Sequence, residues 1–401
     1  CLLVLPAGRC ALSRGLEPMA GKWILPCLLL CCSACDLTGW LNEEAEADHG
    51  YNILCVTDVV TVYVKGYVGC KTVELALDDS LPEKLEDELL LRGRLLFRRG
   101  ERLTAWPKQS WAVFTTAGER WEPQELVQRA RAHRGVPLFL VEGGTWRWPA
   151  IRVGFSREVL SGVRLRTVAV QPALFDLEFS NSEGIPKLLK DVVKASEKSL
   201  FRSITEGKVS DKRTSEQAWL GYNTQQLKDL LNFTVQILRV PERYFEEKMQ
   251  VLRYTLGQFY DAHRDYWDPE EFPDKHRFIH PNSKTWYNRH ATLLWYLQRP
   301  EEGGETWFPR AHGVPIPVNR WTACDDAGVK MGNTSVAILF YSLYSSGDID
   351  TYSWHCGCPV IRGTKWASNA WAWNQPMEKP PFATRRPLRP KMAGNLPPAD
   401  E

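Results

Sequence analysis

A series of strand-like apolar runs in the C-terminal half constrains the fold of this 401-residue chain more than any other feature. The runs are MQVLRYTLGQFYDAHRD, HATLLWYLQ, TSVAILFYSL and KWASNAWAW. Clusters of Gly, Pro, Asn and Asp, which favour turns, separate them. Two segments with apolar residues at helical spacing precede them, NSEGIPKLLKDVVKAS and TQQLKDLLNFTVQIL, and the second has a predicted buried stripe at Leu227, Leu230, Leu231 and Leu238. Helices followed by strands predict an antiparallel β-sandwich or a jelly roll with helices packed on one side.

Residues 36–165 have a different texture. They mix short strand-like runs, ILCVTDVVTVYVKG and VPLFLVEGG, with two helical stretches, LPEKLEDELLLRGRLLF and EPQELVQRARAHRG, the second closed by Gly135. This pattern predicts a small N-terminal α+β module without a recognisable chemical site. The segment TWRWPAIRVG, at 145–154, is predicted to link it to the next domain. The expected organisation is an extension with a leader (1–35), the α+β module (36–165), a catalytic domain (166–375) and a disordered tail (376–401).

The N-terminal extension has the character of a targeting segment. The chain starts with Cys, and Met19 is the better predicted start, because the stretch after it, MAGKWILPCLLLCCSAC, has one lysine, an apolar run and small residues Ser33 and Cys35 before a possible cleavage point. A cleaved signal peptide is expected; a short membrane anchor at 23–35 and no targeting role stay as alternatives. The expected localisation is the endoplasmic reticulum and secretory pathway. The net charge of +2 gives no reason to expect nucleic acid as a partner.

Cysteine usage adds a second expectation. A chain that begins after residue 35 keeps an odd number of cysteines, so at least one thiol stays free or pairs between chains. These cysteines are Cys55, Cys70, Cys324, Cys356 and Cys358. None of them forms a paired CxxC motif of the kind that binds zinc.

The chemistry is concentrated in the predicted strands. YDAHRDYW places His263 and Asp265 two residues apart, so that on a strand both side chains point to one face, as two ligands of a divalent metal would. His355, after another β run, can reach the same point. Two histidines and a carboxylate on one face of a metal leave open positions, as in non-haem Fe(II) oxygenases. Lys365 can then pair with the distal carboxylate of a 2-oxo acid. Taken singly, each residue is as compatible with ordinary packing or surface exposure.

Five segments together resemble the catalytic domain of the prolyl 4-hydroxylases, especially the plant and algal type. They are RTSEQAWL, EEKMQVLRYTLGQFYDAHRDYW, RHATLLWYLQRPEEGGETWFP, MGNTSVAILFYSL and SWHCGCPVIRGTKWASNAW, in the family's order over 166–375. The resemblance implies a double-stranded β-helix (jelly roll) core. It also implies a procollagen-proline 4-dioxygenase-like enzyme that uses Fe(II), 2-oxoglutarate, O2 and ascorbate. Such an enzyme hydroxylates proline in a proline-rich peptide and releases succinate and CO2.

The resemblance also implies roles for individual residues. His263, Asp265 and His355 match the iron ligands, and Lys365, with Tyr254 and Thr306, matches the 2-oxoglutarate site. A polyproline II peptide would dock against aromatic faces. The matching peptide-binding positions are Arg213, Ser215, Glu247, Tyr260, Arg289 and Trp371. Cys324 and Cys358 fall where plant-type enzymes carry cysteines, and a bridge between them is a hypothesis.

Two departures from the family's pattern stand out. Trp373 occupies a position where the family usually has histidine, which leaves peptide selectivity open. The insert DPEEFPDKHRFIHPNSKTWYN is longer than expected, and the nearby His276, His280 and His290 are predicted to be loop residues and not ligands.

Four alternatives remain at this stage. A lysyl hydroxylase usually has arginine at the position of Lys365, and a halogenase usually replaces the carboxylate of Asp265 with a small residue. A zinc hydrolase would have no use for Lys365. A non-catalytic module that binds proline-rich chains would have no reason to keep all four residues.

Overall fold

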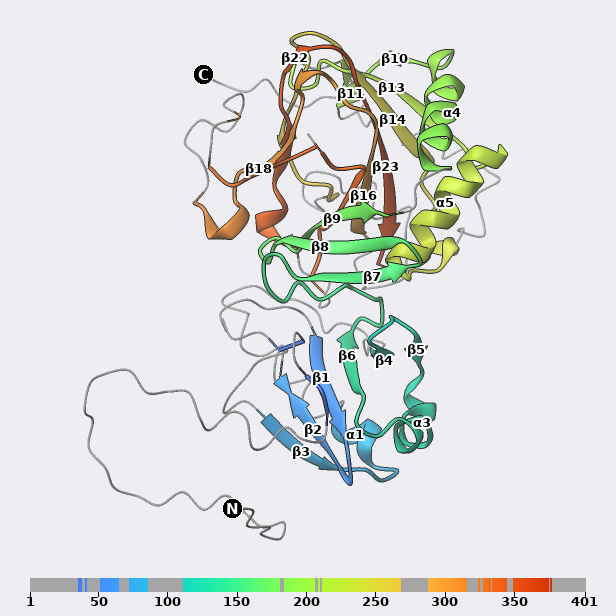
Figure 1. The fold of residues 1–401 in the computed structure, drawn as a ribbon, viewed down its shortest axis with the longest axis vertical. Helices are drawn as coiled ribbons and strands as arrows, with labels where there is room; N and C mark the ends of the chain where they lie inside the picture. The colour runs from blue at the N-terminus through green and yellow to red at the C-terminus, as the bar shows by residue number, and fades with distance from the viewer. Residues whose placement is uncertain are drawn as a thin grey trace, which may run out of the picture.

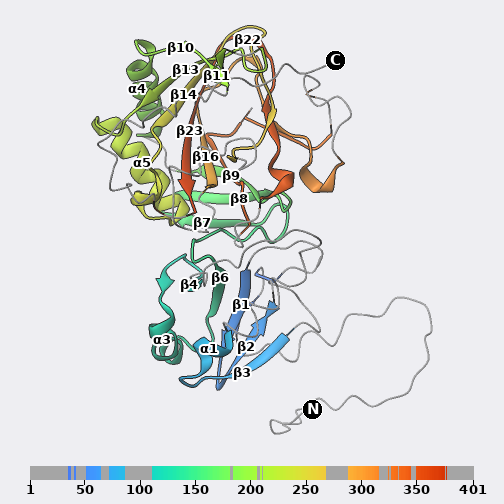
Figure 2. The ribbon, with the colours of Figure 1, turned by 180° about the vertical axis from the view of Figure 1, so that it is seen from behind.

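In the computed structural model, the strands and helices form an N-terminal and a C-terminal part, which meet at a narrow join (Figures 1 and 2). The described residues are 35–37, 40–41, 51–64, 72–85, 111–180, 184–205, 208–209, 211–267, 288–315, 324, 327–332, 334–344, 349–374 and 376. Apart from residues 35 and 376, the predicted leader and tail lie outside them. Within the described residues, no helix is long and apolar enough to cross a membrane.

The N-terminal part is a six-stranded antiparallel sheet with short helices. The strand order is β3-β2-β1-β6-β4-β5. The strands are β1 (Tyr51–Val56), β2 (Val59–Tyr63), β3 (Thr72–Ala76), β4 (Trp111–Thr115), β5 (Arg120–Trp121) and β6 (Pro137–Glu142), and the helical elements are α1 (Leu81–Leu85), η3 (Pro123–Glu125) and α3 (Leu126–Ala132). The runs ILCVTDVVTVYVKG and VPLFLVEGG thus form strands as predicted. Gly135 follows α3 with a φ of +79°, which confirms its predicted place after the helix. The continuation of LPEKLEDELLLRGRLLF beyond Leu85 lies outside the described residues.

Both faces of this sheet are buried. On β1, Leu54 and Val56 pack with α1 and α3, whereas Ile53 and Cys55 join an apolar core that continues into the rest of the molecule. Because side chains alternate across a strand, this double burial accounts for the nearly unbroken apolar run ILCV. The N-terminal sheet and the C-terminal part therefore share one core.

The C-terminal part is built on a nine-stranded antiparallel sheet of order β10-β13-β14-β23-β16-β20-β9-β8-β7. Its strands are β7 (Ser156–Leu160), β8 (Val163–Ala169), β9 (Leu174–Phe179), β10 (Phe201–Arg202), β13 (Glu216–Leu220), β14 (Met249–Tyr254), β16 (Arg289–Gln298), β20 (Ala337–Tyr341) and β23 (Lys365–Trp373). This sheet begins earlier in the chain than the expected boundary at 166, because β7 and β8 pair with each other and β8 pairs with β9.

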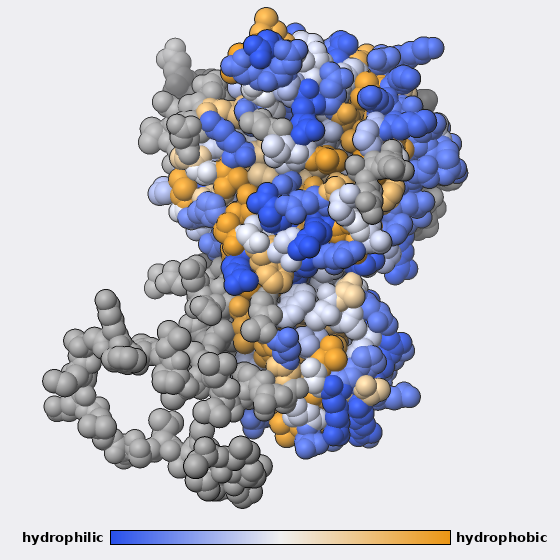
Figure 3. Space-filling model, viewed as in Figure 1, coloured by the Kyte–Doolittle hydropathy of each residue, from blue (hydrophilic) through white to orange (hydrophobic). Residues whose placement is uncertain are grey.

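The two predicted helices cover one side of this sheet, as Figure 1 shows for α4 (Ile185–Glu197) and α5 (Gln225–Leu238). The leucine stripe predicted for α5 is buried at all four positions. In α4, Ile185, Leu189, Val192 and Ser196 are buried at helical spacing, so one face meets the sheet. The opposite faces are polar, and Figure 3 shows hydrophilic side chains along the edge where these helices lie.

Smaller sheets complete the C-terminal part. A four-stranded sheet has the order β15-β21-β18-β19, and β17-β22 and β11-β12 form two-stranded pairs. The remaining elements are β11 (Ile204–Thr205), β12 (Lys208–Val209), β15 (Tyr260–His263), β17 (Glu302–Gly303), β18 (Thr306–Phe308), β19 (Val329–Met331), β21 (His355–Gly357), β22 (Val360–Arg362), η4 (Glu242–Tyr244), η5 (Ala311–Gly313) and η6 (Thr351–Ser353). The run MQVLRYTLGQFYDAHRD is two strands rather than one, because the chain turns at Gly257, whose φ is +74°.

The predicted link at 145–154 is an ordered part of the core rather than an exposed linker. Trp146 and Trp148 are each 1% exposed. The Trp146 ring packs at 5.1 Å from the ring of Phe114 in β4 and at 5.2 Å from Trp148. The indole N–H of Trp148 donates to the carbonyl of Ile237 at 2.7 Å. Side chains of this segment therefore touch both sheets.

A disulfide joins Cys35 to Cys55 in β1. Cys35, which the sequence analysis placed at the end of the predicted leader, is thus tied to a central strand of the N-terminal sheet, and cleavage of a signal peptide stays a prediction. Within the described residues Cys356 is the free thiol.

Candidate active site

Strand pairing brings the two predicted histidine ligands together. His263 ends β15 and His355 begins β21, and the two residues are direct partners in the antiparallel ladder. Cross-strand partners bring their Cβ atoms within about 5.5 Å of each other. The imidazole centroids lie 4.4 Å apart. The strand ends at His263, so Asp265 lies just beyond it, and its carboxylate still reaches the histidines.

The three side chains have the donor set of a divalent metal site. Nε2 of His263 lies 3.9 Å from Oδ1 of Asp265, and Nε2 of His355 lies 3.9 Å from Oδ2. Two atoms that bind the same ion with bonds of about 2.1 Å lie at most about 4.2 Å apart, so both separations are compatible with one shared ion. Two imidazoles and a carboxylate suit Fe(II), so the residues present fit the ion that the sequence predicts.

Both histidines are oriented by the backbone. Nδ1 of His263 hydrogen-bonds the carbonyl of Asp261 at 2.8 Å, and Nδ1 of His355 hydrogen-bonds the carbonyl of Ser353 at 2.9 Å. Because Nδ1 must carry the proton to donate to a carbonyl, Nε2 of each neutral ring keeps its lone pair. Burial and the neighbouring His355 lower the pKa of His263 well below its usual value, so this ring is neutral at physiological pH.

The nine-stranded sheet orients the carboxylate. Oδ2 of Asp265 accepts hydrogen bonds from the Thr292 hydroxyl at 2.8 Å and from the Trp371 indole N–H at 3.0 Å. Burial opposes ionisation of Asp265, but the nearby His355 and Arg289 outweigh it and keep the pKa of the carboxyl below its usual range. Trp371 is 4% exposed. It was predicted to contact the peptide, whereas in the structure its indole N–H is hydrogen-bonded to the Asp265 carboxylate.

Replacing Trp371 by phenylalanine is expected to weaken metal binding about tenfold, because hydrogen bonds to charged acceptors contribute about 1.5–3 kcal/mol and outer-shell partners typically change metal affinity by 10–100-fold. The matched control is Trp366→Phe, a buried tryptophan on the same strand that packs in the apolar core. Co(II) titration followed by visible absorption would measure both. Equal Co(II) affinities in the two variants would contradict this role of the indole N–H.

Lys365 lies in the same interior as a buried cation. It begins β23 opposite Tyr254 of β14. Its Nζ lies 5.4 Å from the Tyr254 ring and 5.5 Å from the ring of Tyr296. Among the residues that the structure describes it forms no salt bridge, and burial lowers its pKa to about 8. Glu305 compensates this charge only in part, because it raises the pKa of Lys365 without outweighing burial, so the buried ammonium can still receive an anion.

Two glycines let the chain close beside this lysine. At Gly303, with φ of +74°, a Cβ would lie 2.4 Å from the carbonyl oxygen of Pro359; at Gly304 it would lie 3.0 Å from Cγ of Pro300 and 3.4 Å from Cδ of Lys365. Side chains are not tolerated at such a conformation and separation. Glycine is therefore required at both positions of the GG pair in EEGGET, because β17 and β22 pack too closely against each other and against the Lys365 side chain for a Cβ atom to fit.

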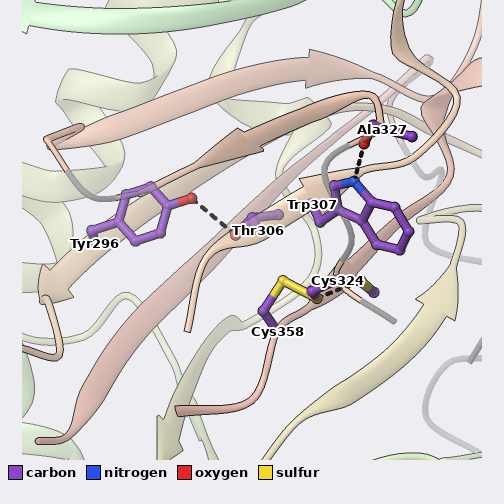
Figure 4. Close-up of a disulfide and its surroundings, with 7 residues drawn as sticks. Tyr296, Thr306, Trp307, Cys324, Ala327 and Cys358 are labelled. Atoms are coloured by element: carbon purple, nitrogen blue, oxygen red, sulfur yellow. Dashed lines mark hydrogen bonds between the residues drawn. A yellow bond between two sulfur atoms is a disulfide. The ribbon is translucent and has the colours of Figure 1, made fainter. Parts of the chain in front are cut away.

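Thr306 lies near the lysine but bonds a residue that the sequence analysis did not single out. Its Oγ1 accepts a hydrogen bond from the hydroxyl of Tyr296 at 2.9 Å, as Figure 4 shows. A tyrosine inside the run HATLLWYLQ is indistinguishable from a core residue by pattern alone. The hydroxyl of Thr292 is equally hidden, since it is a β-branched residue in the same run.

The six expected peptide contacts are more buried than exposed. Arg213 stacks 4.4 Å from the ring centroid of Tyr260, and the Tyr260 ring stacks 3.7 Å from that of His263. The Ser215 hydroxyl is fully buried and bonds Ser203 at 2.8 Å.

Glu247 and Arg289 form a buried bidentate pair at 2.6 and 2.5 Å. Nη1 of Arg289 lies 3.9 Å from Oδ1 of Asp265, and its guanidinium lies 3.6 Å from the Trp371 ring. Arg289 thus sits beside the metal-binding carboxylate.

Of the three nearby histidines, only His290 lies within the described residues. The prediction that it is a loop residue is wrong. It is a buried residue of β16, whose ring lies 5.1 Å from Tyr341 and bonds the carbonyl of Trp146 at 3.1 Å. The strand begins at Arg289, earlier than the apolar run indicated. His276 and His280 lie outside the described residues.

The predicted bridge between Cys324 and Cys358 is confirmed (Figure 4). It lies beside β18, where the Trp307 indole N–H donates to the carbonyl of Ala327 at 2.5 Å. Cys356, which directly follows the candidate ligand His355, has its Sγ atom 3.8 Å from Sγ of Cys324.

Comparisons with known proteins agree with this geometry. Residues 249–373 match the family model described as the 2OG-Fe(II) oxygenase superfamily. Probable prolyl 4-hydroxylase 3 of Arabidopsis thaliana is 41% identical over 133 residues, which is 31% of this chain and 42% of that protein. Probable prolyl 4-hydroxylase 10 of the same plant is 39% identical over 132 residues, 31% of this chain and 41% of that protein. The chain thus spans less than half the length of these curated relatives.

A solved structure is also similar. The viral collagen prolyl hydroxylase of Paramecium bursaria Chlorella virus-1, in complex with 2OG, aligns with 47% of this chain and 90% of its own, at 24% sequence identity and a TM-score of 0.32. The matched segment holds His263, Asp265, His355 and Lys365. Residues 249–373 therefore match the 2OG-Fe(II) oxygenase superfamily and are similar to the prolyl 4-hydroxylases of Arabidopsis thaliana.

Proposed function

We propose that the protein is a peptidyl-proline 4-hydroxylase that uses Fe(II), 2-oxoglutarate and O2, with ascorbate to keep the iron reduced. The observation that carries this is that a His-Asp-His cluster and a buried lysine, which forms no salt bridge among the described residues, lie in one interior. The names of the matched plant relatives support proline as the substrate residue. When bound, Fe(II) supplies the activation of O2 that couples the decarboxylation of 2-oxoglutarate to hydroxylation of a C–H bond.

The chain's own residues perform the binding and orientation. His263, Asp265 and His355 hold the ion through their Nε2 and carboxylate atoms. Lys365 binds the distal carboxylate of 2-oxoglutarate, and the Thr306 hydroxyl, which accepts from Tyr296 and keeps its own hydrogen, is a further donor. Because the ammonium is buried among aromatic rings, its attraction for a carboxylate is little screened by water.

We propose Tyr260 as the residue that meets the substrate proline most directly. Its ring stacks on His263 and is contacted by Arg213, and it is not fully buried, so its exposed edge offers an aromatic surface next to the metal ligands. Proline rings pack well on aromatic side chains in polyproline II segments. Arg213, packed against Tyr260, would hold that ring in place. The ion pair of Glu247 with Arg289 would hold the indole ring of Trp371, on which Arg289 packs.

We interpret the nine-stranded and four-stranded sheets as the two sides of a double-stranded β-helix. The hydrogen bonds from Thr292 and Trp371 on one sheet to Asp265 beside the other support this interpretation. Two disulfides, Cys35–Cys55 and Cys324–Cys358, support an oxidising compartment, and we propose the secretory pathway as the place of action.

The test is turnover with defined peptides. Purified protein is incubated with Fe(II), 2-oxoglutarate, ascorbate and a panel of proline-rich peptides, and mass spectrometry locates added oxygen while succinate is quantified. The expected result is one added oxygen on proline that disappears in His355→Ala. A lysine-containing peptide series separates lysine hydroxylation from proline hydroxylation. Absence of peptide oxidation, with succinate no higher than in an iron-free control, would show the proposed function to be wrong.

A further inference from the structure

The segment that joins the two sheets, residues 145–148, is tied to the larger sheet at several points. The Thr145 hydroxyl donates to the carbonyl of Asn374, just after β23, at 2.7 Å. The backbone N–H of Trp148 donates to the Tyr341 hydroxyl of β20 at 2.9 Å. This segment lies outside the residues that the superfamily model matches.

Arg147 extends from this segment into the interior. Its Nη1 donates to the carbonyl of Leu343 at 2.8 Å, and its guanidinium lies 5.0 Å from the ring of Tyr341 and 5.4 Å from that of Tyr344. Its Nη2 lies 3.8 Å from Oδ2 of Asp350, and the two side chains are 5% and 1% exposed. A buried arginine and a buried aspartate thus face each other across the join.

Asp350 holds the turn that follows it. Its Oδ1 accepts hydrogen bonds from the backbone N–H of Tyr352 at 3.0 Å and from the hydroxyl of Tyr344 at 3.2 Å. Among the described residues its Oδ2 has no hydrogen-bond partner, and it faces Arg147. Burial raises the pKa of Asp350, and the positive charge of Arg147 opposes that rise. Arg147 is therefore the stronger of the two positive charges, with Arg310, that compensate this buried carboxylate.

The same turn orients a metal ligand. The N–H and the hydroxyl of Ser353 donate to the carbonyl oxygen of Asp350 at 3.0 and 2.7 Å. The carbonyl of Ser353 in turn accepts the Nδ1–H of His355 at 2.9 Å. A series of contacts thus runs from Arg147 through Asp350 and Ser353 to the imidazole: the first is the 3.8 Å ion pair, and the others are hydrogen bonds.

We propose that Arg147 is a positioning residue for the metal centre: by neutralising Asp350 it fixes the turn at 351–353, and this turn sets the orientation and tautomer of His355. The proposal rests on the assignment of His355 as a metal ligand under the proposed function. Arg147 lies outside residues 249–373, which match the superfamily model. The proposal therefore gives a residue from outside the matched segment a part in building the metal site.

The experiment measures Co(II) binding by the full chain, in the absence of 2-oxoglutarate, from the visible absorption of the bound ion. Arg147→Met is expected to lower Co(II) affinity about tenfold, in the range typical of partners that orient a metal ligand. Arg147→Lys, which keeps a positive charge toward Asp350, is expected to recover part of the loss. Affinity is read independently of turnover, so a failure to hydroxylate any peptide would leave this measurement intact.

Arg157→Met is the matched control. Arg157 is also a buried arginine of the join, 8% exposed, with its Nη2 donating to the carbonyl of Pro149 at 2.6 Å and its guanidinium 4.8 Å from the Trp40 ring. It shares the surroundings of Arg147 but not the contact with Asp350. Its Co(II) affinity is expected to stay within about twofold of the parent, since no ligand of the metal depends on it.

A double variant separates positioning from general destabilisation. In an Asp350→Asn background the buried charge is gone, so Arg147→Met should cause no further loss of Co(II) affinity. A loss of equal size in both backgrounds, or an equal loss in Arg157→Met, would overturn the proposal, as would unchanged affinity in Arg147→Met. If the single variant Arg147→Met does not fold, Asp350→Asn is compared with the double variant Asp350→Asn/Arg147→Met. A double variant that folds and binds Co(II) with the affinity of the parent protein supports the proposal. A double variant that does not fold overturns it.

Discussion

Asp265→Ala is expected to abolish Fe(II) binding at micromolar concentrations and to reduce succinate formation to the iron-free background. Asp265 is the one carboxylate of the ligand set, and its loss leaves two neutral imidazoles to hold the ion. It also leaves the donors of Thr292 and Trp371 unsatisfied and the Arg289 charge facing the site. Outer-shell changes cost up to about 100-fold in metal affinity, so removal of a direct ligand should exceed that.

Asp261→Ala is the control for this prediction. Asp261 lies on the same strand, is 9% exposed, and provides its backbone carbonyl, not its carboxylate, to His263. The variant should bind Fe(II) like the parent, because the carbonyl is unchanged. Isothermal titration with Fe(II) under anaerobic conditions, together with a succinate assay, would compare the two. Retained Fe(II) binding in Asp265→Ala, or an equal loss in Asp261→Ala, would refute the assignment of the ligand set.

Lys365→Met is expected to weaken binding of 2-oxoglutarate by about two to three orders of magnitude. Methionine fills similar volume, but the distal carboxylate is then buried without a cation, and breaking a buried ion pair costs about 3–5 kcal/mol. The metal site should be intact, because Lys365 touches tyrosine rings and not the ligand set. Binding is best measured with labelled 2-oxoglutarate and Co(II) in place of iron.

The pH dependence of the same binding gives an independent check. Because burial lowers the pKa of Lys365 to about 8, the free protein loses this charge as the pH rises through that value. Affinity for the dianion should be constant below about pH 8 and fall by up to about tenfold per pH unit above it, since binding then requires uptake of a proton. Lys365→Met should show a flat profile over the same range.

Lys330→Met serves as the control, since Lys330 is an exposed lysine on β19 of the neighbouring sheet. It should keep both the parental affinity and the parental pH profile. An unchanged dissociation constant in Lys365→Met, or a fall in affinity above pH 8 that persists in that variant, would show that another group holds the carboxylate.

The cluster of His263, Asp265 and His355 was predictable because its residue types are rare and their chemistry is specific, and their role as metal ligands stays a prediction. HxD on a strand and a distant histidine before a lysine pointed to His263, Asp265 and His355 before any geometry was known. That His263 and His355 are direct ladder partners could not be read from the sequence, because strand pairing between distant segments depends on the whole sheet.

Other features escaped because their local pattern suits more than one environment. Thr292 and Tyr296 lie in an apolar strand, where a hydroxyl looks like part of the core until its partner is known. Strand β7 and the first residues of β8 were assigned to the N-terminal module because short alternating runs do not reveal the sheet that they join. The segment around Trp146 reads as a linker by its Pro and Gly neighbours, whereas its burial depends on two distant sheets.

The apolar core that passes from the N-terminal sheet through Trp146 and Trp148 to the larger sheet has a thermodynamic consequence. Separating the two parts would expose these indole rings and the inner face of β1 to water, at about 25 cal/mol for each Å² of apolar surface. The two parts are thus coupled into one cooperative folding unit, and the nine-stranded sheet draws part of its stability from a sheet that contributes no residue to the cluster of His263, Asp265 and His355.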